Sequence, residues 1–367
     1  MSACEPCLRR AALLGRLVPW IERTLDQRRR IPEVLALPDE QLIESVCGER
    51  RARIDRFMQS FDAGDAMRHA KRAGLATVCP HEGCYPSALR TQRDGPAALY
   101  LKGDTALLEQ LESERPVAVV GSRQASGYGK EVAYTLGREL AATGVPVVSG
   151  LAFGVDAAAH EGALAAHGPA VAVMPSGADV SYPRSHHKLH RRLCEQGLVV
   201  SEMPPGATPL KWCFPARNRI MAGLGHMTVV VEGTATSGSL ITAQFAHDFG
   251  REVGAVPGQV TSGLAAGPNS LLADGACLVR SASDVLDALY GAGARPARPA
   301  AARAVLEPRL EQLLEAVEAG HGVDSIVRAG REIGDVLAGL TELELLGLVR
   351  RGPGGAYVRS AGGGPYS

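Results

Sequence analysis

The chain has 367 residues, of which 46% are hydrophobic and 4% aromatic, and its 39 Lys and Arg residues balance 39 Asp and Glu residues. This length predicts two or three domains. The charge balance excludes a protein that coats a polyanion with its whole surface, but it permits a local basic groove, because binding depends on how charge is distributed.

The N-terminal segment predicts neither a signal peptide nor a membrane anchor. Residues 1–17 carry basic side chains but contain no long apolar core and no cleavage site. No apolar run approaches the ~20 residues that a membrane helix needs. We therefore expect a cytoplasmic protein without membrane association, whose eight cysteines are thiols.

Two cysteine pairs lie near the N-terminus. Cys4 and Cys7 form C-x-x-C, and Cys79 and Cys84 flank His81. A zinc site made by these residues together, His81 included and with Cys4, Cys7, Cys79 and Cys84 as the named ligands, is one interpretation. The favoured interpretation is that these cysteines are unrelated thiols, because C-x4-C lacks the usual spacing of zinc ligands. The prediction is therefore no metal, with these four cysteines as the alternative.

Residues 8 to 75 are rich in Arg, Leu and Ala and contain no convincing strand. They predict a helical N-terminal domain, 1–78. Within it, Asp39 is a candidate N-cap for the apolar-periodic run PDEQLIESV.

A connector over 80–115 leads to apolar segments that alternate with helical stretches. The segments are 117–120, 145–148, 170–174, 198–201, 227–231, 252–256 and 277–279. Continuous apolar strands separated by helices indicate a parallel sheet covered on both faces. We predict an α/β fold for 79–290, an extended Rossmann-like, doubly wound and mostly parallel sheet.

The C-terminal part begins with an Ala/Pro/Gly-rich linker, 291–304. Three helical stretches and a hairpin around the GPGG at 352–355 then predict a winged-helix domain over 305–360. Its third helix, 331–346, is acidic, so phosphates would repel it. We expect this domain to contact protein and not DNA.

The loops after the predicted strands are built from Gly, Ser and Thr with interspersed Arg. In open parallel sheets, ligands bind beyond the carboxyl ends of the strands. Glycine lets backbone N–H groups approach a ligand, and helix N-termini add partial positive charge. Several such anion pockets in a row match a chain of phosphates. The candidate residues are Gly121, Ser122, Arg123, Gly150, Gly154, Ser237, Gly238 and Ser239.

The two common nucleotide-binding motifs do not fit the loop that follows the predicted strand 117–120. A dinucleotide fingerprint fails at Ser122–Arg123, and a P-loop fails because Glu131 follows Lys130. We therefore predict no cofactor. Asp156 and His160, four residues apart on one helix, are either an acid/base pair or a support for the loop 150–154. The second interpretation is favoured, so no catalytic residue is predicted.

The segment FPARNR contains Arg217, Asn218 and Arg219 at a predicted helix start. These arginines can anchor phosphates, or they can buttress neighbouring loops or a subunit contact. The asparagine can read a base edge or tie down a loop. Both interpretations stay open for each residue. Phe214, Tyr182 and Trp212 are candidate stacking platforms for bases, and core packing is favoured for at least two of them.

The ordered series GSR, SGLAFGVDAAAH, PSGADVSYP, SEMPPG, FPARNR, VVVEGTATSGSLITAQFA, VPG and GPNSLLADGA resembles the DprA/Smf family of DNA-processing proteins of natural transformation. The resemblance covers roughly 175 residues. It implies a homodimer that binds and protects single-stranded DNA, loads RecA onto it and has no catalytic turnover. It also implies that Arg123 and Lys188 contact DNA. One alternative is a nucleotide-processing hydrolase of the lysine-decarboxylase-like class, which EGTATSGSL disfavours because it lacks that class's glycine cluster. A purely structural scaffold is another.

Overall fold

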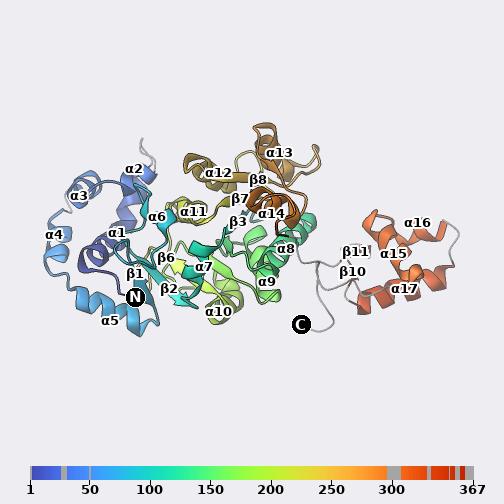
Figure 1. Cartoon of the computed structure of the whole chain (residues 1–367), viewed down its shortest axis with the longest axis horizontal. Helices are drawn as coiled ribbons and strands as arrows, with labels where there is room; N and C mark the ends of the chain where they lie inside the picture. The colour runs from blue at the N-terminus through green and yellow to red at the C-terminus, as the bar shows by residue number, and fades with distance from the viewer. Residues whose placement is uncertain are drawn as a thin grey trace. The chain divides into compact units, whose positions relative to one another are not determined.

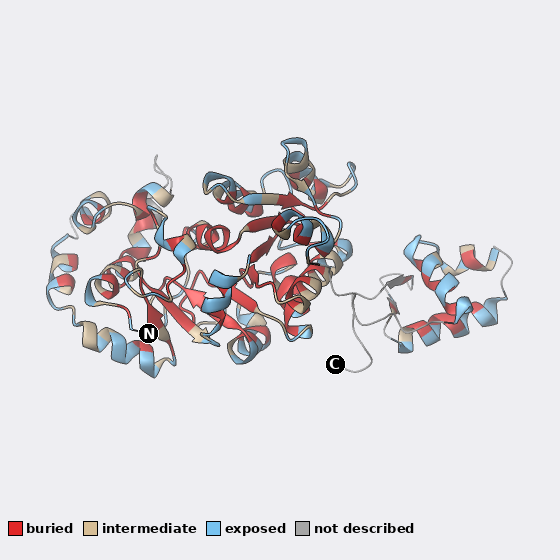
Figure 2. Ribbon diagram, in the orientation of Figure 1, coloured by how far each residue is buried: buried red, intermediate tan, exposed pale blue. Residues whose placement is uncertain are grey.

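The structure is a computed structural model that describes residues 2–25, 31–48, 51–295, 307–328, 332–346, 348–351 and 356–359. It divides into two compact units, Met1–Arg298 and Pro299–Ser367 (Figure 1). The described residues of each unit bury their own hydrophobic core, coloured red in Figure 2. The boundary near residue 298 falls within the predicted linker, most of which lies outside the described residues.

The N-terminal part is helical, as the composition predicts. Its helices are α1 (Glu5–Leu25), α2 (Ile31–Leu35), α3 (Asp39–Cys47), α4 (Arg51–Gln59) and α5 (Ala63–Arg72). Leu14, Leu17 and Ile21 of α1 recur at helical spacing and pack against α3 and α4. The predicted N-cap at Asp39 is wrong. Asp39 is the first residue of α3, after Pro38, and its carboxylate accepts a hydrogen bond from Arg10.

A nine-stranded sheet forms the centre of the first unit, in the order β1-β2-β6-β5-β4-β3-β7-β8-β9. Its strands are β1 (Ala76–Val78), β2 (Leu99–Gly103), β3 (Val117–Val120), β4 (Val147–Ser149), β5 (Ala170–Val173), β6 (Leu198–Ser201), β7 (Met227–Val230), β8 (Glu252–Ala255) and β9 (Cys277–Leu278). The strands from β3 onward pair in parallel, whereas β1 and β2 form an antiparallel edge against β6.

Helices cover both faces of this sheet, which confirms the predicted doubly wound fold (Figure 1). They are α6 (Ser87–Arg90), α7 (Leu107–Ser113), α8 (Gly127–Ala142), α9 (Val155–Ala165), α10 (His187–Gln196), α11 (Cys213–Leu224), α12 (Gly238–Asp248), α13 (Ala266–Ala273) and α14 (Ala282–Tyr290), with 3-10 turns η2 (Arg184–His186) and η3 (Gly263–Ala265). Val117 and Val119 pack into one core, and Ala118 and Val120 into the other. This alternation follows from the two-residue period of a strand.

The second unit contains three helices and a paired hairpin in its described residues. These are α15 (Pro308–Glu318), α16 (Val323–Arg328), α17 (Ile333–Leu345), β10 (Val349–Arg351) and β11 (Tyr357–Arg359). The helices agree with the predicted stretches, and the GPGG at 352–355 lies outside the described residues. The core gathers Leu313, Leu340 and Leu343.

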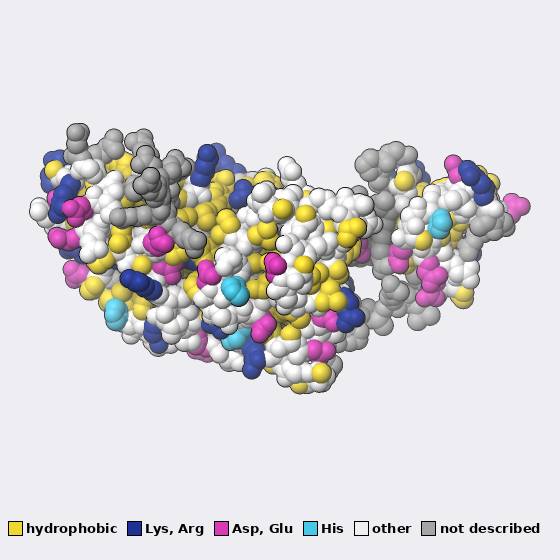
Figure 3. All heavy atoms as spheres, turned by 90° about the horizontal axis from the view of Figure 1, so that it is seen from above, with side chains coloured by type: hydrophobic (Ala, Val, Ile, Leu, Met, Phe, Trp, Pro, Cys, Tyr) yellow, Lys and Arg dark blue, Asp and Glu magenta, His cyan; other side chains and the backbone are white. Residues whose placement is uncertain are grey.

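Charges of both signs are interspersed over the face drawn in Figure 3. This mixture agrees with the zero net charge of the chain. In the part of the chain that the structure describes, no helix combines the length and the apolar character that crossing a membrane requires.

Candidate nucleic-acid interface

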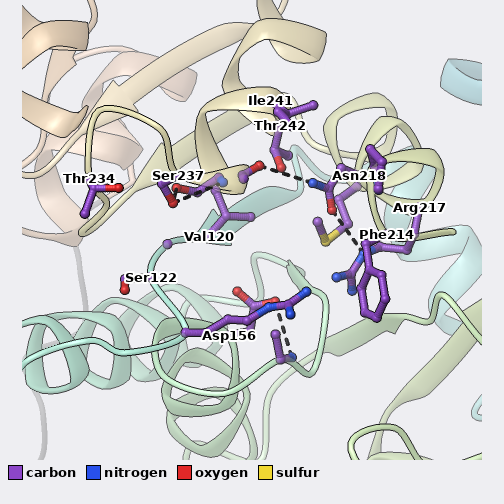
Figure 4. A pocket seen from close by; sticks show the side chains of 17 residues that line it. Val120, Ser122, Asp156, Phe214, Arg217, Asn218, Thr234, Ser237, Ile241 and Thr242 are labelled. Atoms are coloured by element: carbon purple, nitrogen blue, oxygen red, sulfur yellow. Dashed lines mark hydrogen bonds between the residues drawn. The ribbon is translucent and has the colours of Figure 1, made fainter. Parts of the chain in front are cut away.

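The strand order of the sheet reverses beside β3. The chain runs from β3 through β4 and β5 to β6 on one side, then returns to β7 on the other side of β3. In open α/β sheets, this switch point is where a ligand crevice forms at the carboxyl ends of the strands. A pocket of about 280 Å³ opens there (Figure 4), and its lining includes Gly121, Ser122, Arg123, Arg217, Asn218, Ser237, Gly238 and Ser239.

The first wall of this switch-point pocket is the loop after β3. Its backbone is fastened to the end of β7, because Ser122 N donates to Glu232 O at 2.7 Å. The backbone N and the hydroxyl of Ser126 donate to the Glu232 carboxylate at 2.8 and 2.6 Å. Ser126 also caps α8 by accepting from Gly129 N. The loop is therefore held before any ligand arrives.

Three helices begin at the pocket. Ser237 caps α12, and its hydroxyl lies 2.8 Å from that of Ser239. Asp156 belongs to the first turn of α9, and Phe214 to the first turn of α11, and both line the pocket. Their N-termini direct partial positive charge toward this space. The SGS at 237–239 thus stands at the start of α12.

Asp156 supports the glycine loop, as the favoured interpretation predicted. Its carboxylate accepts from Gly150 N at 3.1 Å and from Ala152 N at 3.4 Å. Burial raises the pKa of Asp156, while the positive charge of Arg217 opposes that shift. His160 is fully buried, and burial lowers its pKa to about 3, so the imidazole is neutral near pH 7.

Arg217 and Asn218 hold neighbouring elements together, so the buttressing interpretation applies to both. Nη1 of Arg217 donates to the carbonyl oxygens of Gly150 and Val173, at 2.6 and 2.7 Å. Burial lowers the pKa of Arg217 to about 10, so it keeps its charge beneath the pocket. Asn218 Nδ2 donates to Gly238 O at 3.3 Å, which joins α11 to the start of α12.

Arg219 does not face the pocket, which corrects its assignment as a phosphate anchor. Its side chain is 1% exposed and donates to the Glu202 carboxylate at 2.7 Å. The carboxylate of Asp94 lies 3.3 Å from its Nε. Arg219 directly follows Asn218 in α11, and the rotation of about 100° per residue turns its side chain toward the interior. Its charge is used inside the fold and is unavailable to a ligand.

Arg123 stands at the mouth of the pocket beside aromatic rings. Its guanidinium lies 4.8 Å from the centroid of Phe214, and the rings of Phe214 and Tyr182 are 5.5 Å apart. A second, smaller hollow of about 60 Å³ shares Arg123, Phe214 and Arg217 with the first and also includes Gly150. Tyr182 is exposed and Phe214 half-buried.

Phe153 is a surface aromatic residue that the sequence analysis missed. It is 46% exposed, lines the second hollow, and packs edge-on against His186 with ring centroids 4.6 Å apart. A large aromatic residue inside the glycine loop SGLAFG was the available signal. Lys188, two residues after His186, is exposed on α10. Cation and aromatic side chains thus follow one another from β3 to α10.

Two other residues that the sequence analysis singled out do not line the switch-point pocket. Gly154 is the N-cap of α9 with φ of 76°, behind the loop, where it supports the wall without lining it. Trp212 is buried and donates from Nε1 to Val18 O, so only one of the three stacking candidates belongs to the core. The expectation that at least two belong there is wrong, because Tyr182 and Phe214 reach the surface.

The fold and the pocket define a Rossmann-like α/β protein with a pocket at the switch point of its sheet and a C-terminal winged-helix domain. Residues 76–290 match the family model of DNA recombination-mediator protein A, and residues 294–355 match the DprA winged helix domain. The chain therefore belongs to the DNA recombination-mediator protein A family, which includes the proteins called DprA and Smf.

Relatives match over most of this chain. Protein Smf of Escherichia coli is 38% identical over 284 residues, which cover 75% of each chain. The solved structure of DprA from Streptococcus pneumoniae has a TM-score of 0.62 and 32% identity, covering 79% of this chain and 99% of its own. That of Helicobacter pylori DprA, described for its single-stranded DNA binding mode, has a TM-score of 0.53 and 31% identity, covering 59% and 95%.

Proposed function

We propose that this recombination mediator binds single-stranded DNA along the edge that runs from the switch-point pocket to α10. The observation that carries the proposal is the convergence of three helix N-termini and Arg123 on one pocket. Phosphates would bind at the loop 121–123 and at the start of α12, 237–239. The rings of Tyr182, Phe214 and Phe153 would stack on bases, which every base permits because each has a π-face.

The wider role that we propose is the protection of incoming single strands and the loading of RecA onto them during natural transformation, by a cytoplasmic homodimer. The family description as a recombination mediator supports this role over a nucleotide hydrolase. We also propose that DNA is held without turnover. Asp156 already accepts two backbone N–H groups and His160 is fully buried, so neither is available as a general base.

Competition binding tests the choice of ligand. A labelled single-stranded oligonucleotide is displaced by unlabelled single strand or by duplex of the same sequence, and we expect the single strand to compete far better. Arg123→Glu should weaken binding by about 10- to 100-fold, since a charge-assisted contact is replaced by repulsion. Lys71→Glu reverses an exposed charge on α5, remote from the edge, and should leave affinity unchanged. Equal competition by duplex would overturn the proposal.

Tyr182→Ala tests the stacking contact. Loss of one base–ring stack should cost about 1–3 kcal/mol of binding free energy, whereas Tyr182→Phe keeps the ring and should bind like the parent chain. Fluorescence anisotropy with a labelled oligonucleotide measures both variants. Equal affinities of Tyr182→Ala and Tyr182→Phe would exclude this ring from the interface.

A further inference from the structure

Four metal-ligand side chains from two distant segments meet at one corner of the first unit. Cys4 and Cys7 lie at the start of α1, whereas Cys79 and His81 directly follow strand β1. One donor atom from each residue lies within 4.8 Å of all the others. The sequence separation between the two segments makes this meeting a property of the tertiary fold.

Four of the six separations among these atoms are close to the edges of a zinc-centred tetrahedron, and all six are within 4.8 Å. Typical Zn–S and Zn–N bond lengths give edges of about 3.8 Å between sulfurs and about 3.6 Å between sulfur and nitrogen. Here Sγ of Cys79 lies 3.8 Å from Sγ of Cys4. Nδ1 of His81 lies 3.3, 3.4 and 3.8 Å from the sulfurs of Cys4, Cys7 and Cys79.

The surroundings of the cluster suit a soft, closed metal site. Cys7 and Cys79 are buried and Cys4 is half-buried, so the sulfurs are shielded, while His81 lies at the surface. The backbone N of Cys4 lies 3.4 Å from Sγ of Cys79, as a donor that stabilises a ligating thiolate. Three thiols and an imidazole favour zinc over magnesium or calcium, which prefer oxygen ligands.

We propose that Cys4, Cys7, Cys79 and His81 bind one structural zinc ion that fastens the N-terminal helices to the edge of the sheet. The same corner is already joined by backbone contacts, because Ala3 N donates to Thr77 Oγ1 at 3.2 Å and Ser2 N to the Glu82 carboxylate at 2.7 Å. With four protein ligands no coordination position stays open, so the role is structural.

This ligand set corrects the four cysteines that the sequence suggested. Cys84 is outside the cluster and packs instead with the core on the other face of the sheet. His81 takes its place. The result is C-x-x-C from the helix and C-x-H from the segment after β1. The single-residue spacing of Cys79 and His81 is shorter than that of usual zinc-ligand pairs, so the spacing alone does not identify them as ligands. The turn after β1 brings the two side chains together in the fold.

Metal analysis of the full chain, purified under reducing conditions without added chelator, tests the site. We expect one zinc ion per chain by mass spectrometry. Replacement by Co²⁺ should give the thiolate charge-transfer and tetrahedral d–d absorption bands of a Cys3His site. Cys7→Ser and His81→Ala should each lose most of the bound metal. Cys84→Ser, which removes a nearby thiol outside the cluster, should keep it.

Chelation of the parent chain provides a second readout that needs no substitution. A strong chelator should release the zinc and lower the midpoint of thermal unfolding, and Zn²⁺ but not Mg²⁺ should restore it. A chain that neither contains zinc nor takes up Co²⁺ would overturn the proposal. A disulfide between Cys4 and Cys79 in the chain as isolated, or metal loss from Cys84→Ser equal to that from Cys7→Ser, would overturn it as well.

Discussion

Three arginines near the switch-point pocket illustrate how burial decides what a charged side chain does. Arg123 is exposed beside an aromatic ring, Arg217 is buried against carbonyl oxygens, and Arg219 is buried against carboxylates. Arg123 alone among the three can reach a polyanion without breaking internal contacts. Arg217 supports the loops that a ligand would meet, whereas Arg219 joins elements in the interior.

Arg219→Ala should destabilise the fold far more than it alters a binding surface. It would leave the buried carboxylates of Glu202 and Asp94 without their partner, at a cost of about 3–5 kcal/mol in the free energy of unfolding. Urea denaturation measures this change. Arg280→Ala, which removes an exposed arginine paired with Asp284, is the control and should shift the midpoint little. Equal effects of the two substitutions would contradict the interior role of Arg219.

The sequence could propose the arginines of FPARNR but could not assign their roles. Arg219 is identified as structural only by Asp94 and Glu202, which are far from it in the chain. By contrast, Asp156 could be assigned from sequence, since it stands at the start of a helix beside the glycine loop that it supports. A local contact can be read from spacing, whereas a long-range partner cannot.

At the scale of elements, the walls of the pocket depend on how closely backbone segments approach. Gly154 adopts φ of 76°, and a Cβ built there would lie 2.2 Å from Ser122 O in the loop after β3. That oxygen already accepts a hydrogen bond from Val155 N. Neither segment can move away without opening the pocket.

Gly154→Ala should therefore disturb both stability and binding. The positive φ and the close carbonyl together should cost about 1–3 kcal/mol of folding free energy, and single-strand affinity should fall with the displaced loop. Thermal unfolding and anisotropy titration measure the two effects. Gly127→Ala is the matched control at the first residue of α8, where an added Cβ meets nothing within 4 Å. A neutral Gly154→Ala would refute this account of the wall.

Apolar runs predicted the parallel strands well, because strands buried on both faces are continuously hydrophobic. The strands β1 and β2 were missed and assigned to helix and connector. β1 is the edge strand, and β2 lies between it and β6. The partner β6 is far along the chain, and its antiparallel pairing with β2 leaves no local hairpin signal. Their stability comes from a long-range partner and not from their own composition.

At the scale of the whole molecule, the two compact units have separate cores in their described residues. The second unit also balances part of the charge of its acidic helix α17, since Glu342 pairs with Arg309 at 3.0 Å and Glu344 with Arg351 at 3.6 Å. These exposed pairs are weak, so the helix stays unfavourable for phosphate. Protein contact by this unit stays a prediction.

Removal of residues 299–367 should leave the first unit folded and its single-strand affinity within about twofold, because none of the proposed contacts lies in the second unit. Circular dichroism and anisotropy titration of the truncated chain, beside the full chain, measure this. A large loss of affinity in a truncated chain that is still folded would place DNA contacts in the winged helix, against our expectation.

The salt dependence of single-strand binding tests the central claim, an anionic ligand held at the switch-point edge, most directly. Affinity for a labelled oligonucleotide is measured across a series of salt concentrations for the parent chain, Arg123→Ala and Lys71→Ala. We predict a steep fall of affinity with salt, and a slope of log affinity against log salt that is about 0.7 shallower in Arg123→Ala and unchanged in Lys71→Ala. A flat salt dependence, or equal slopes in all three proteins, would contradict the account.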